Sequence, residues 1–177
     1  MKKQVLDKTF VPYLSKTEIE NAVTRLAANI NEDYVGKNPL MIAILNGSFM
    51  FASDLFKKIS IPAEISFIKL ASYKGTKSTG SVITAIGLEA DVFERDVLII
   101  EDIVDTGKTL SEFLPQLKHQ QPRSLKICSL LHKKQATQYP IEIDYLGFEI
   151  PNLFVVGYGL DYNGQGRNID EIMQIEG

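Results

Sequence analysis

The sequence predicts an α/β fold with a mostly parallel, twisted sheet and helices on both faces. Short apolar runs alternate with segments of helical periodicity, which is the order of elements in parallel sheets. The 177 residues are 45% hydrophobic, enough for one sizeable core, and no internal repeat divides them. We therefore expect a single domain over residues 1–177. The terminal segments, roughly 1–14 and 150–177, stand outside the alternation and are expected to form a small hood over the strand ends.

The first elements are marked by capping and turn residues. Ser15-Lys16-Thr17-Glu18 fits a capping box and opens a segment with apolar residues at helical spacing, which Gly36 closes. Leu40 to Leu45 is a continuous apolar run, typical of a buried strand. Asn46-Gly47-Ser48 then turns the chain into a second helix, from about Phe49 to Lys58.

A polar segment interrupts the next two strands. The first of them passes through Ile65, Phe67 and Leu70. Ser72 to Gly80 is small, polar and charged, so we expect a mobile loop there. Ser81 to Ile86 resumes the composition of a strand.

The second half of the chain continues the alternation. Val97 to Ile100 has the length and branching of a buried parallel strand, and a helix is expected from about Lys108 to His119. Leu125 to Leu131 predicts another strand. Two more are expected around Pro151, at Tyr145–Ile150 and Leu153–Val156.

Composition narrows the function classes. The net charge of −3 argues against a nucleic-acid-binding role, because no global basic field recruits phosphates. The single cysteine, Cys128, excludes an internal disulfide and is expected to be a small buried hydrophobe. No stretch reaches the ~18 consecutive apolar residues of a membrane span. We expect a soluble, cytoplasmic protein that binds no membrane.

The most informative segment runs from Val97 to Thr109. Its strand is followed by Glu101 and Asp102 and then by the loop Asp105-Thr106-Gly107-Lys108-Thr109. In open α/β sheets, ligands bind at the carboxyl ends of the strands. Gly107 allows close approach to backbone N–H groups, and the next helix offers its positive N-terminus. The loop therefore predicts a seat for one terminal monophosphate.

This loop is not a nucleoside-triphosphate loop of the Walker A type. Gly107-Lys108-Thr109 matches the last three residues of that motif, but Asp102 stands where its first glycine belongs. A carboxylate there would repel a triphosphate. Glu101 and Asp102 could simply be solvated loop residues. Beside a phosphate seat they are useful if they accept hydrogen bonds from ribose hydroxyls or hold a divalent cation.

The stretch Glu101-Asp102-Ile103-Val104-Asp105-Thr106-Gly107-Lys108-Thr109 resembles the phosphoribosyl-pyrophosphate (PRPP) signature of type I phosphoribosyltransferases. The wider match, from about Val5 to Arg167, is to the hypoxanthine-guanine phosphoribosyltransferases of purine salvage. The resemblance implies transfer of the 5-phosphoribosyl group from PRPP to N9 of hypoxanthine or guanine. It also implies release of pyrophosphate, a Mg²⁺ cofactor and a homodimer or homotetramer.

The resemblance assigns a role to each part of the signature. Glu101 and Asp102 are implied to bind the ribose hydroxyls and metal, and Asp105 to act as general acid or base at purine N7. The implied phosphate seat consists of Thr106, Gly107, Lys108 and Thr109.

Other loops complete the implied PRPP site. Asn46 and Gly47 match the pyrophosphate loop, where many relatives carry lysine in place of Asn46. An ordinary Asn-Gly turn is the alternative. Arg167 matches an arginine that clamps pyrophosphate with its fork of donors. Ser72 and Tyr73 match a catalytic lid that keeps water from the reacting sugar, and a plain exposed loop is the alternative there.

Four residues are implied to bind the purine or, in one case, the Mg²⁺ on the pyrophosphate side. Lys133 matches a lysine that contacts the 6-oxo group, although a lysine after a strand is usually a solvated charge. Phe154 would stack on the base, although a phenylalanine in a strand usually belongs to the core. Val155 would offer backbone groups to the base edge, and Asp161 would bind Mg²⁺. The Gly164-Gln165-Gly166 segment is more glycine-rich than in relatives.

Two rival functions remain at this level. One is a regulatory protein that senses PRPP with the same pocket and binds nucleic acid, which the acidic composition opposes. The other is a nucleoside-triphosphate hydrolase, which Asp102 opposes. The sequence does not rank hypoxanthine, guanine and xanthine.

Overall fold

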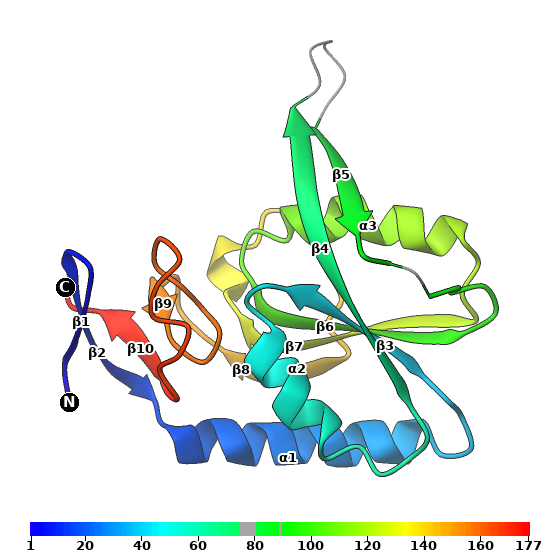
Figure 1. The fold of residues 1–177 in the computed structure, drawn as a ribbon, viewed down its shortest axis with the longest axis horizontal. Helices are drawn as coiled ribbons and strands as arrows, with labels where there is room; N and C mark the ends of the chain where they lie inside the picture. The colour runs from blue at the N-terminus through cyan, green and yellow to red at the C-terminus, as the bar shows by residue number, and fades with distance from the viewer. Residues whose placement is uncertain (75–80, 89) are drawn as a thin grey trace.

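A computed structural model describes residues 1–74, 81–88 and 90–177 (Figure 1); the side chains of residues 71–74 and 81–86 lie outside this description. The larger sheet has six strands, in the order β5 (Ser81–Ile86), β4 (Glu64–Lys74), β3 (Leu40–Leu45), β6 (Asp96–Val104), β7 (Ser124–His132) and β8 (Tyr145–Glu149). All neighbours are parallel except the antiparallel pair β4 and β5. The predicted α/β class with a mostly parallel sheet is confirmed.

Helices cover both faces of this sheet. α1 (Lys16–Asp33) and α2 (Phe49–Phe56) pack on one face, and α3 (Lys108–His119) packs on the other (Figure 1). Successive side chains of β3 point to opposite faces of the sheet. Met41 and Ala43 therefore pack in the core beneath α1 and α2, whereas Leu40 and Ile42 pack in the core beneath α3.

The predicted capping box is confirmed at the start of α1. The Ser15 hydroxyl accepts a hydrogen bond from the Glu18 backbone N–H, and the Glu18 carboxylate accepts one from the Ser15 N–H at 2.8 Å.

A second, antiparallel sheet is built from the two ends of the chain. Its order is β1 (Lys3–Val5), β2 (Lys8–Leu14), β10 (Ile172–Ile175) and β9 (Val155–Val156). Phe10, Val156 and Met173 form its buried core. Figure 1 shows this sheet beside the larger one, with both chain termini in it.

The signature strand is longer than predicted. β6 continues to Val104, so Glu101 and Asp102 lie within a strand and not in a loop. The reason is the neighbouring strand, because Glu101 pairs with Ser129 and Val104 with His132 in the ladder to β7. The loop that precedes α3 is therefore confined to residues 105–107.

The polar loop predicted from Ser72 also begins too early. Ser72 and Tyr73 belong to β4, where they pair with Ile83 and Val82 of β5. Antiparallel pairing stabilises this segment despite its polar composition. Residues 75–80 of the predicted loop, and the side chains of Ser72 and Tyr73, lie outside the described residues.

Smaller differences concern element ends. α2 stops at Phe56, two residues before the predicted end, and β9 is limited to Val155–Val156 because only these residues pair with β10. Cys128 is fully buried, as predicted. Among the described residues, no helix combines the length and apolar character needed to cross a membrane.

Candidate active site

A cavity of about 140 Å³ lies at the carboxyl end of β6. Glu101 contributes to its wall from the strand, and Ile44 contributes from the end of β3. β6 also contributes Ile103 and Val104. The loop and the first turn of α3 supply the rest, namely Asp105, Thr106, Gly107, Lys108, Thr109 and Leu110. The structure thus gathers most of the signature around one small cavity.

Gly107 shapes the loop in which the sequence predicts a phosphate seat. It is the N-cap of α3 and has a φ of +80°, a conformation that favours glycine. A Cβ added there would lie 2.2 Å from the Tyr139 carbonyl oxygen, so the loop also needs the missing side chain. The Thr106 hydroxyl accepts a hydrogen bond from the Lys108 N–H at 3.3 Å. The first N–H groups of a helix have no partner within it, so they are suited to an anion.

We expect Gly107→Ala to destabilise the protein more than an equally strained control. Gly36 has a φ of +73° but no atom within 4 Å of an added Cβ, so Gly36→Ala carries only the backbone strain, about 1 kcal/mol. The contact with Tyr139 should cost Gly107→Ala at least about 2 kcal/mol more. Urea denaturation of both variants measures this difference. Equal losses would show that the contact is relieved without cost.

The two acids of the signature face different neighbours. Glu101 lines the cavity, whereas Asp102 is buried against Gly47, where an added Cβ would lie 1.7 Å from its Oδ2. Burial raises the pKa of Glu101 well above its ordinary value, and the neighbouring Asp102 raises it further. Burial also raises the pKa of Asp102. Such a pair favours hydrogen-bond donors or a cation beside it.

The loop after β3 is held closely on two sides. Gly47 packs against Asp102 on one side, and its carbonyl oxygen lies 2.1 Å from where Gly159 would carry a Cβ. The Ser48 hydroxyl donates to the Ile44 carbonyl oxygen at 2.6 Å. The Leu45–Asn46 peptide bond is cis. This loop is therefore part of the same end of the sheet as the signature.

Lys133 is buried and paired, not a solvated surface charge. It is 7% exposed, and its Nζ donates to Asp105 Oδ2 at 2.8 Å. Its backbone N–H donates to the Val104 carbonyl oxygen at 2.9 Å. The structure thereby joins the two residues that were expected to contact the purine 6-oxo group and N7.

Thr137 supports the site but was not among the residues predicted from the sequence. Its hydroxyl lies 3.3 Å from the Asp105 carbonyl oxygen, 3.2 Å from that of Lys133 and 3.0 Å from His132 Nε2. The backbone N–H groups of residues 138 and 139 both donate to the Thr106 carbonyl oxygen at 3.0 Å. The segment after β7 thus supports the signature loop. Nothing in the local sequence around Thr137 signals this contact.

Phe154 is not a core residue. It is 44% exposed, and its ring lies edge-on to Tyr162 at a centroid distance of 5.7 Å. Phe10 is 6.2 Å away and completes an aromatic group on the small sheet. The adjacent Val155 is buried and pairs with Gln174 of β10. Phe154 therefore has exposed ring surface for a planar ligand.

Two tight turns shape the glycine-rich segment that follows β9. Gly157–Leu160 and Tyr162–Gln165 are each closed by a reciprocal pair of backbone hydrogen bonds. The φ values of the two central residues are positive, 48° and 98° in the first turn and 49° and 83° in the second. Such values are those of type I′ turns, which favour Asn-Gly and similar pairs.

These turns bring Asp161 and Arg167 together. Arg167 Nη2 pairs with Asp161 Oδ1 at 2.7 Å, and its Nη1 donates to the Gly159 carbonyl oxygen at 2.6 Å. Asp161 Oδ2 accepts from the Gly164 N–H at 2.7 Å. Both side chains are therefore held in place by this segment of the chain.

The three predicted metal-binding acids do not form one metal centre. Within the described part of the chain, no group of three His, Cys, Asp or Glu side chains is placed to hold an ion. Mg²⁺ usually takes one or two carboxylates together with water and substrate phosphates. Glu101 lines the cavity and Asp161 is held beside Arg167, so each can supply one carboxylate to such a shared site.

The chain is similar to known phosphoribosyltransferases in sequence. The sequence model of the phosphoribosyl transferase domain matches residues 13–163. Hypoxanthine phosphoribosyltransferase from Buchnera aphidicola subsp. Schizaphis graminum is 45% identical over 165 residues, which cover 92% of this chain and 93% of the relative. Hypoxanthine-guanine phosphoribosyltransferase from Mycobacterium tuberculosis is 40% identical, covering 90% and 82%.

A solved structure and a longer relative extend the comparison. The crystal structure of a hypoxanthine phosphoribosyltransferase from Staphylococcus aureus has a TM-score of 0.87 and 40% identity, covering 94% of this chain and 91% of that one. The bifunctional protein TilS/HprT from Listeria innocua is 42% identical over 160 residues. The chain spans 25% of the length of that relative.

Proposed function

The chain belongs to the phosphoribosyl transferase family, and we propose that it is a purine-salvage enzyme. It transfers the 5-phosphoribosyl group of PRPP to N9 of hypoxanthine or guanine and releases pyrophosphate, giving IMP or GMP. The observation that carries the proposal is the ion pair between the buried Lys133 and the partly exposed Asp105. It places a residue suited to a 6-oxopurine directly beside the loop suited to PRPP.

The cavity at β6 supports binding of the ribose 5-phosphate part. The phosphate takes the N–H groups at the start of α3 and the hydroxyls of Thr106 and Thr109, while Lys108 adds positive charge. Glu101 accepts hydrogen bonds from the ribose hydroxyls inside the cavity. Asp102, which lies against Gly47, supplies a second acidic group for the ribose hydroxyls.

The base is recognised by donors that adenine cannot use. An ammonium group has three donors and no acceptor, so Lys133 keeps donors for a 6-oxo group while it pairs with Asp105. A 6-amino group would meet a donor with a donor. Phe154 stacks on the ring, and Val155 offers backbone groups to the base edge.

Asp105 serves as the proton acceptor and donor at purine N7. It is 47% exposed at the side chain, so it can reach a ligand in the cavity while Lys133 holds it. Cleavage at the anomeric carbon develops positive charge on the sugar ring, as in glycoside chemistry. The carboxylates of Glu101 and Asp102 stabilise that charge.

The pyrophosphate lies toward Asn46, Gly47 and Arg167. Asn46 carries no charge, so this loop acts through backbone N–H groups. Arg167 has five donors, of which some already hold Asp161 and Gly159. Carboxylates such as Asp161 and Glu101 would hold Mg²⁺, and the bound ion would supply positive charge to neutralise the leaving group.

Water must be kept from the reacting sugar. We assign this task to the lid that carries Ser72 and Tyr73 and to the small terminal sheet, which acts as the hood of a single domain. The exposed ring of Phe154 on that sheet supports the assignment.

Removal of the metal should abolish turnover. Excess chelator is expected to stop nucleotide formation, and added Mg²⁺ should restore it. Asp161→Asn is expected to raise the Mg²⁺ concentration needed for half-maximal rate by about tenfold, because it weakens one carboxylate ligand. Initial rates against Mg²⁺ concentration measure both effects. Full activity in chelator would remove the metal from the proposal.

The direct test is product analysis. The purified chain, PRPP, Mg²⁺ and hypoxanthine should give IMP and equimolar pyrophosphate, both quantified chromatographically. The regulatory rival is tested by filter binding with RNA and DNA at physiological salt. Nucleic-acid binding without nucleotide formation would favour that rival.

We also propose a cytoplasmic homodimer or homotetramer, in line with the family resemblance. The buried, unpaired Cys128 suits a reducing compartment. Light scattering after size-exclusion chromatography measures the assembly, and a monomer at all concentrations would contradict it.

A further inference from the structure

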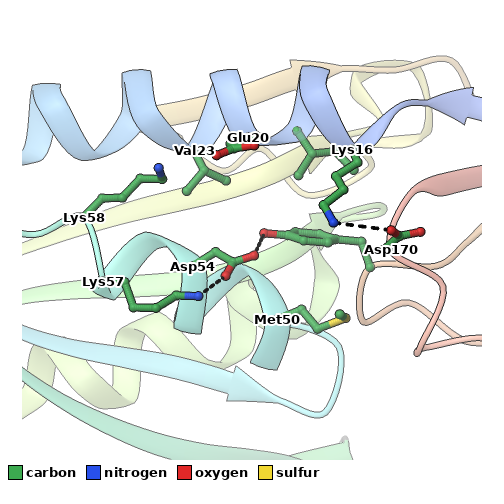
Figure 2. A pocket seen from close by; sticks show the side chains of 10 residues that line it. Lys16, Glu20, Val23, Met50, Asp54, Lys57, Lys58 and Asp170 are labelled. Carbon is green, nitrogen blue, oxygen red and sulfur yellow. Dashed lines mark hydrogen bonds and ion pairs between the residues drawn. The ribbon is translucent and has the colours of Figure 1, made fainter.

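Tyr158 connects two segments that are far apart in the sequence. Its ring lies in a cavity of about 480 Å³ between α1 and α2, and its hydroxyl donates to Asp54 Oδ2 of α2 at 2.8 Å. Figure 2 shows this cavity, with Asp54 and Lys57 on one wall and Glu20 and Val23 of α1 opposite. Tyr158 is 5% exposed, so the hydroxyl needs a partner within the protein.

Asp54 is prepared to accept this hydrogen bond. Lys57 Nζ pairs with Asp54 Oδ1 at 2.6 Å, which leaves Oδ2 to Tyr158 (Figure 2). Partial burial opposes ionisation of Asp54, but the hydrogen bonds from Lys57 and Tyr158 lower its pKa below the ordinary value. Burial and the Asp54 carboxylate raise the pKa of Tyr158. The pair is therefore a neutral phenol that donates to a carboxylate, a strong type of hydrogen bond.

On its other side, Tyr158 adjoins the pyrophosphate end of the proposed site. The next residue, Gly159, packs against the Gly47 carbonyl oxygen and accepts a hydrogen bond from Arg167. The Gly159 N–H donates back to the Arg167 carbonyl oxygen at 3.0 Å. The Gly157–Leu160 turn, which contains Tyr158, thus touches both the Asn46–Gly47 loop and the Arg167 side chain.

The hydrogen bond from Tyr158 to Asp54 also ties the turn to α2. This helix begins at Phe49, directly after the Asn46–Gly47 loop, and Asp54 lies in its second turn. A tyrosine anchored on Asp54 therefore fixes the turn relative to the helix that carries the loop. Gly159 itself meets Gly47 through close packing, and the Tyr158 backbone N–H donates to the Ile169 carbonyl oxygen at 2.7 Å.

We propose that Tyr158 and Asp54 are positioning residues that hold the Gly157–Leu160 turn against the Asn46–Gly47 loop and so set the spacing of the pyrophosphate subsite. The pair touches no substrate. This inference rests on the proposed function, because it names the part of that site which the pair controls. It concerns PRPP and pyrophosphate and leaves the purine end, at Lys133, unaffected.

Tyr158→Phe tests the inference, because it removes the hydroxyl and keeps the ring in the cavity. The expected result is a rise of about tenfold in the KM for PRPP and in the inhibition constant of pyrophosphate, with the KM for hypoxanthine within about twofold. Asp54→Asn keeps a carbonyl acceptor and should stay within about threefold of the parent. Lys57→Gln leaves the hydroxyl bond in place and should match the parent.

A purely structural role predicts a different pattern. Equal changes in both KM values, or a lower melting temperature with unchanged kinetics, would overturn the inference. If Tyr158→Phe does not fold, Asp54→Ala takes its place with the same expectations. Should the parent itself form no nucleotide, the proposed function fails first. Calorimetric binding of Mg²⁺-pyrophosphate to the parent and to Tyr158→Phe then still decides the inference, which equal affinities would contradict.

Discussion

Asp105→Asn is expected to lower kcat by about 100- to 10,000-fold, the usual contribution of a general acid or base. The substitution is isosteric and keeps an oxygen that accepts from Lys133, so the hydrogen bond can be retained although the ion pair is lost. What it removes is the ability to take the proton at purine N7. The dissociation constant of PRPP should change by less than about threefold, since phosphate and ribose are proposed to bind to other parts of the cavity.

Steady-state kinetics and direct PRPP binding measure the two quantities separately. Asp91→Asn is a matched control, because Asp91 is an exposed aspartate that accepts from the Phe93 N–H at 2.9 Å, and its variant should have parent activity. Undiminished turnover in Asp105→Asn would remove Asp105 from the mechanism. A loss of PRPP binding equal to the loss of kcat/KM would make Asp105 a binding residue instead.

Lys133→Met should reduce kcat/KM for hypoxanthine by about 100- to 1,000-fold. Methionine has similar length and no charge, so the base loses its donor to the 6-oxo group and Asp105 loses its buried partner. Discrimination against adenine should shrink as well, because the donor that rejects a 6-amino group is gone. Competition between hypoxanthine and adenine at equal concentrations measures this change.

Lys134→Met is the control for that variant. Lys134 is the adjacent lysine, but it is exposed and only 3.6 Å from Glu149 at the surface, so its loss should be nearly neutral. Urea denaturation confirms that Lys133→Met remains folded. If it keeps the activity and the base preference of the parent, Lys133 is not the residue that reads the purine.

Local signals explain which elements were predicted well. β3 and α3 have the predicted ends, because a continuous apolar run and a glycine-initiated amphipathic segment define them within the chain itself. β6 and β4 were predicted too short. Their polar ends, such as Asp102 and Tyr73, are held in strands by ladders to β7 and β5, which local composition does not reveal.

The site shows the same division. Residues 105–109 could be predicted to meet in one place because they are contiguous, and the cavity at β6 contains them all. The burial of Lys133 and the exposure of Phe154 run against the usual behaviour of these residue types. The Tyr158–Asp54 hydrogen bond spans 104 positions, and only the packed fold brings its partners together.

The most direct test of the account is the rate of nucleotide formation with a panel of bases, followed by absorbance with PRPP and Mg²⁺. Product is expected with hypoxanthine, guanine or both, and kcat/KM with adenine should be about 100-fold lower, because Lys133 offers only donors at the 6-position. Including xanthine in the same panel ranks the three 6-oxopurines, which differ in their substituent at C2. Absence of product with every 6-oxopurine, or an equal rate with adenine, would contradict the account.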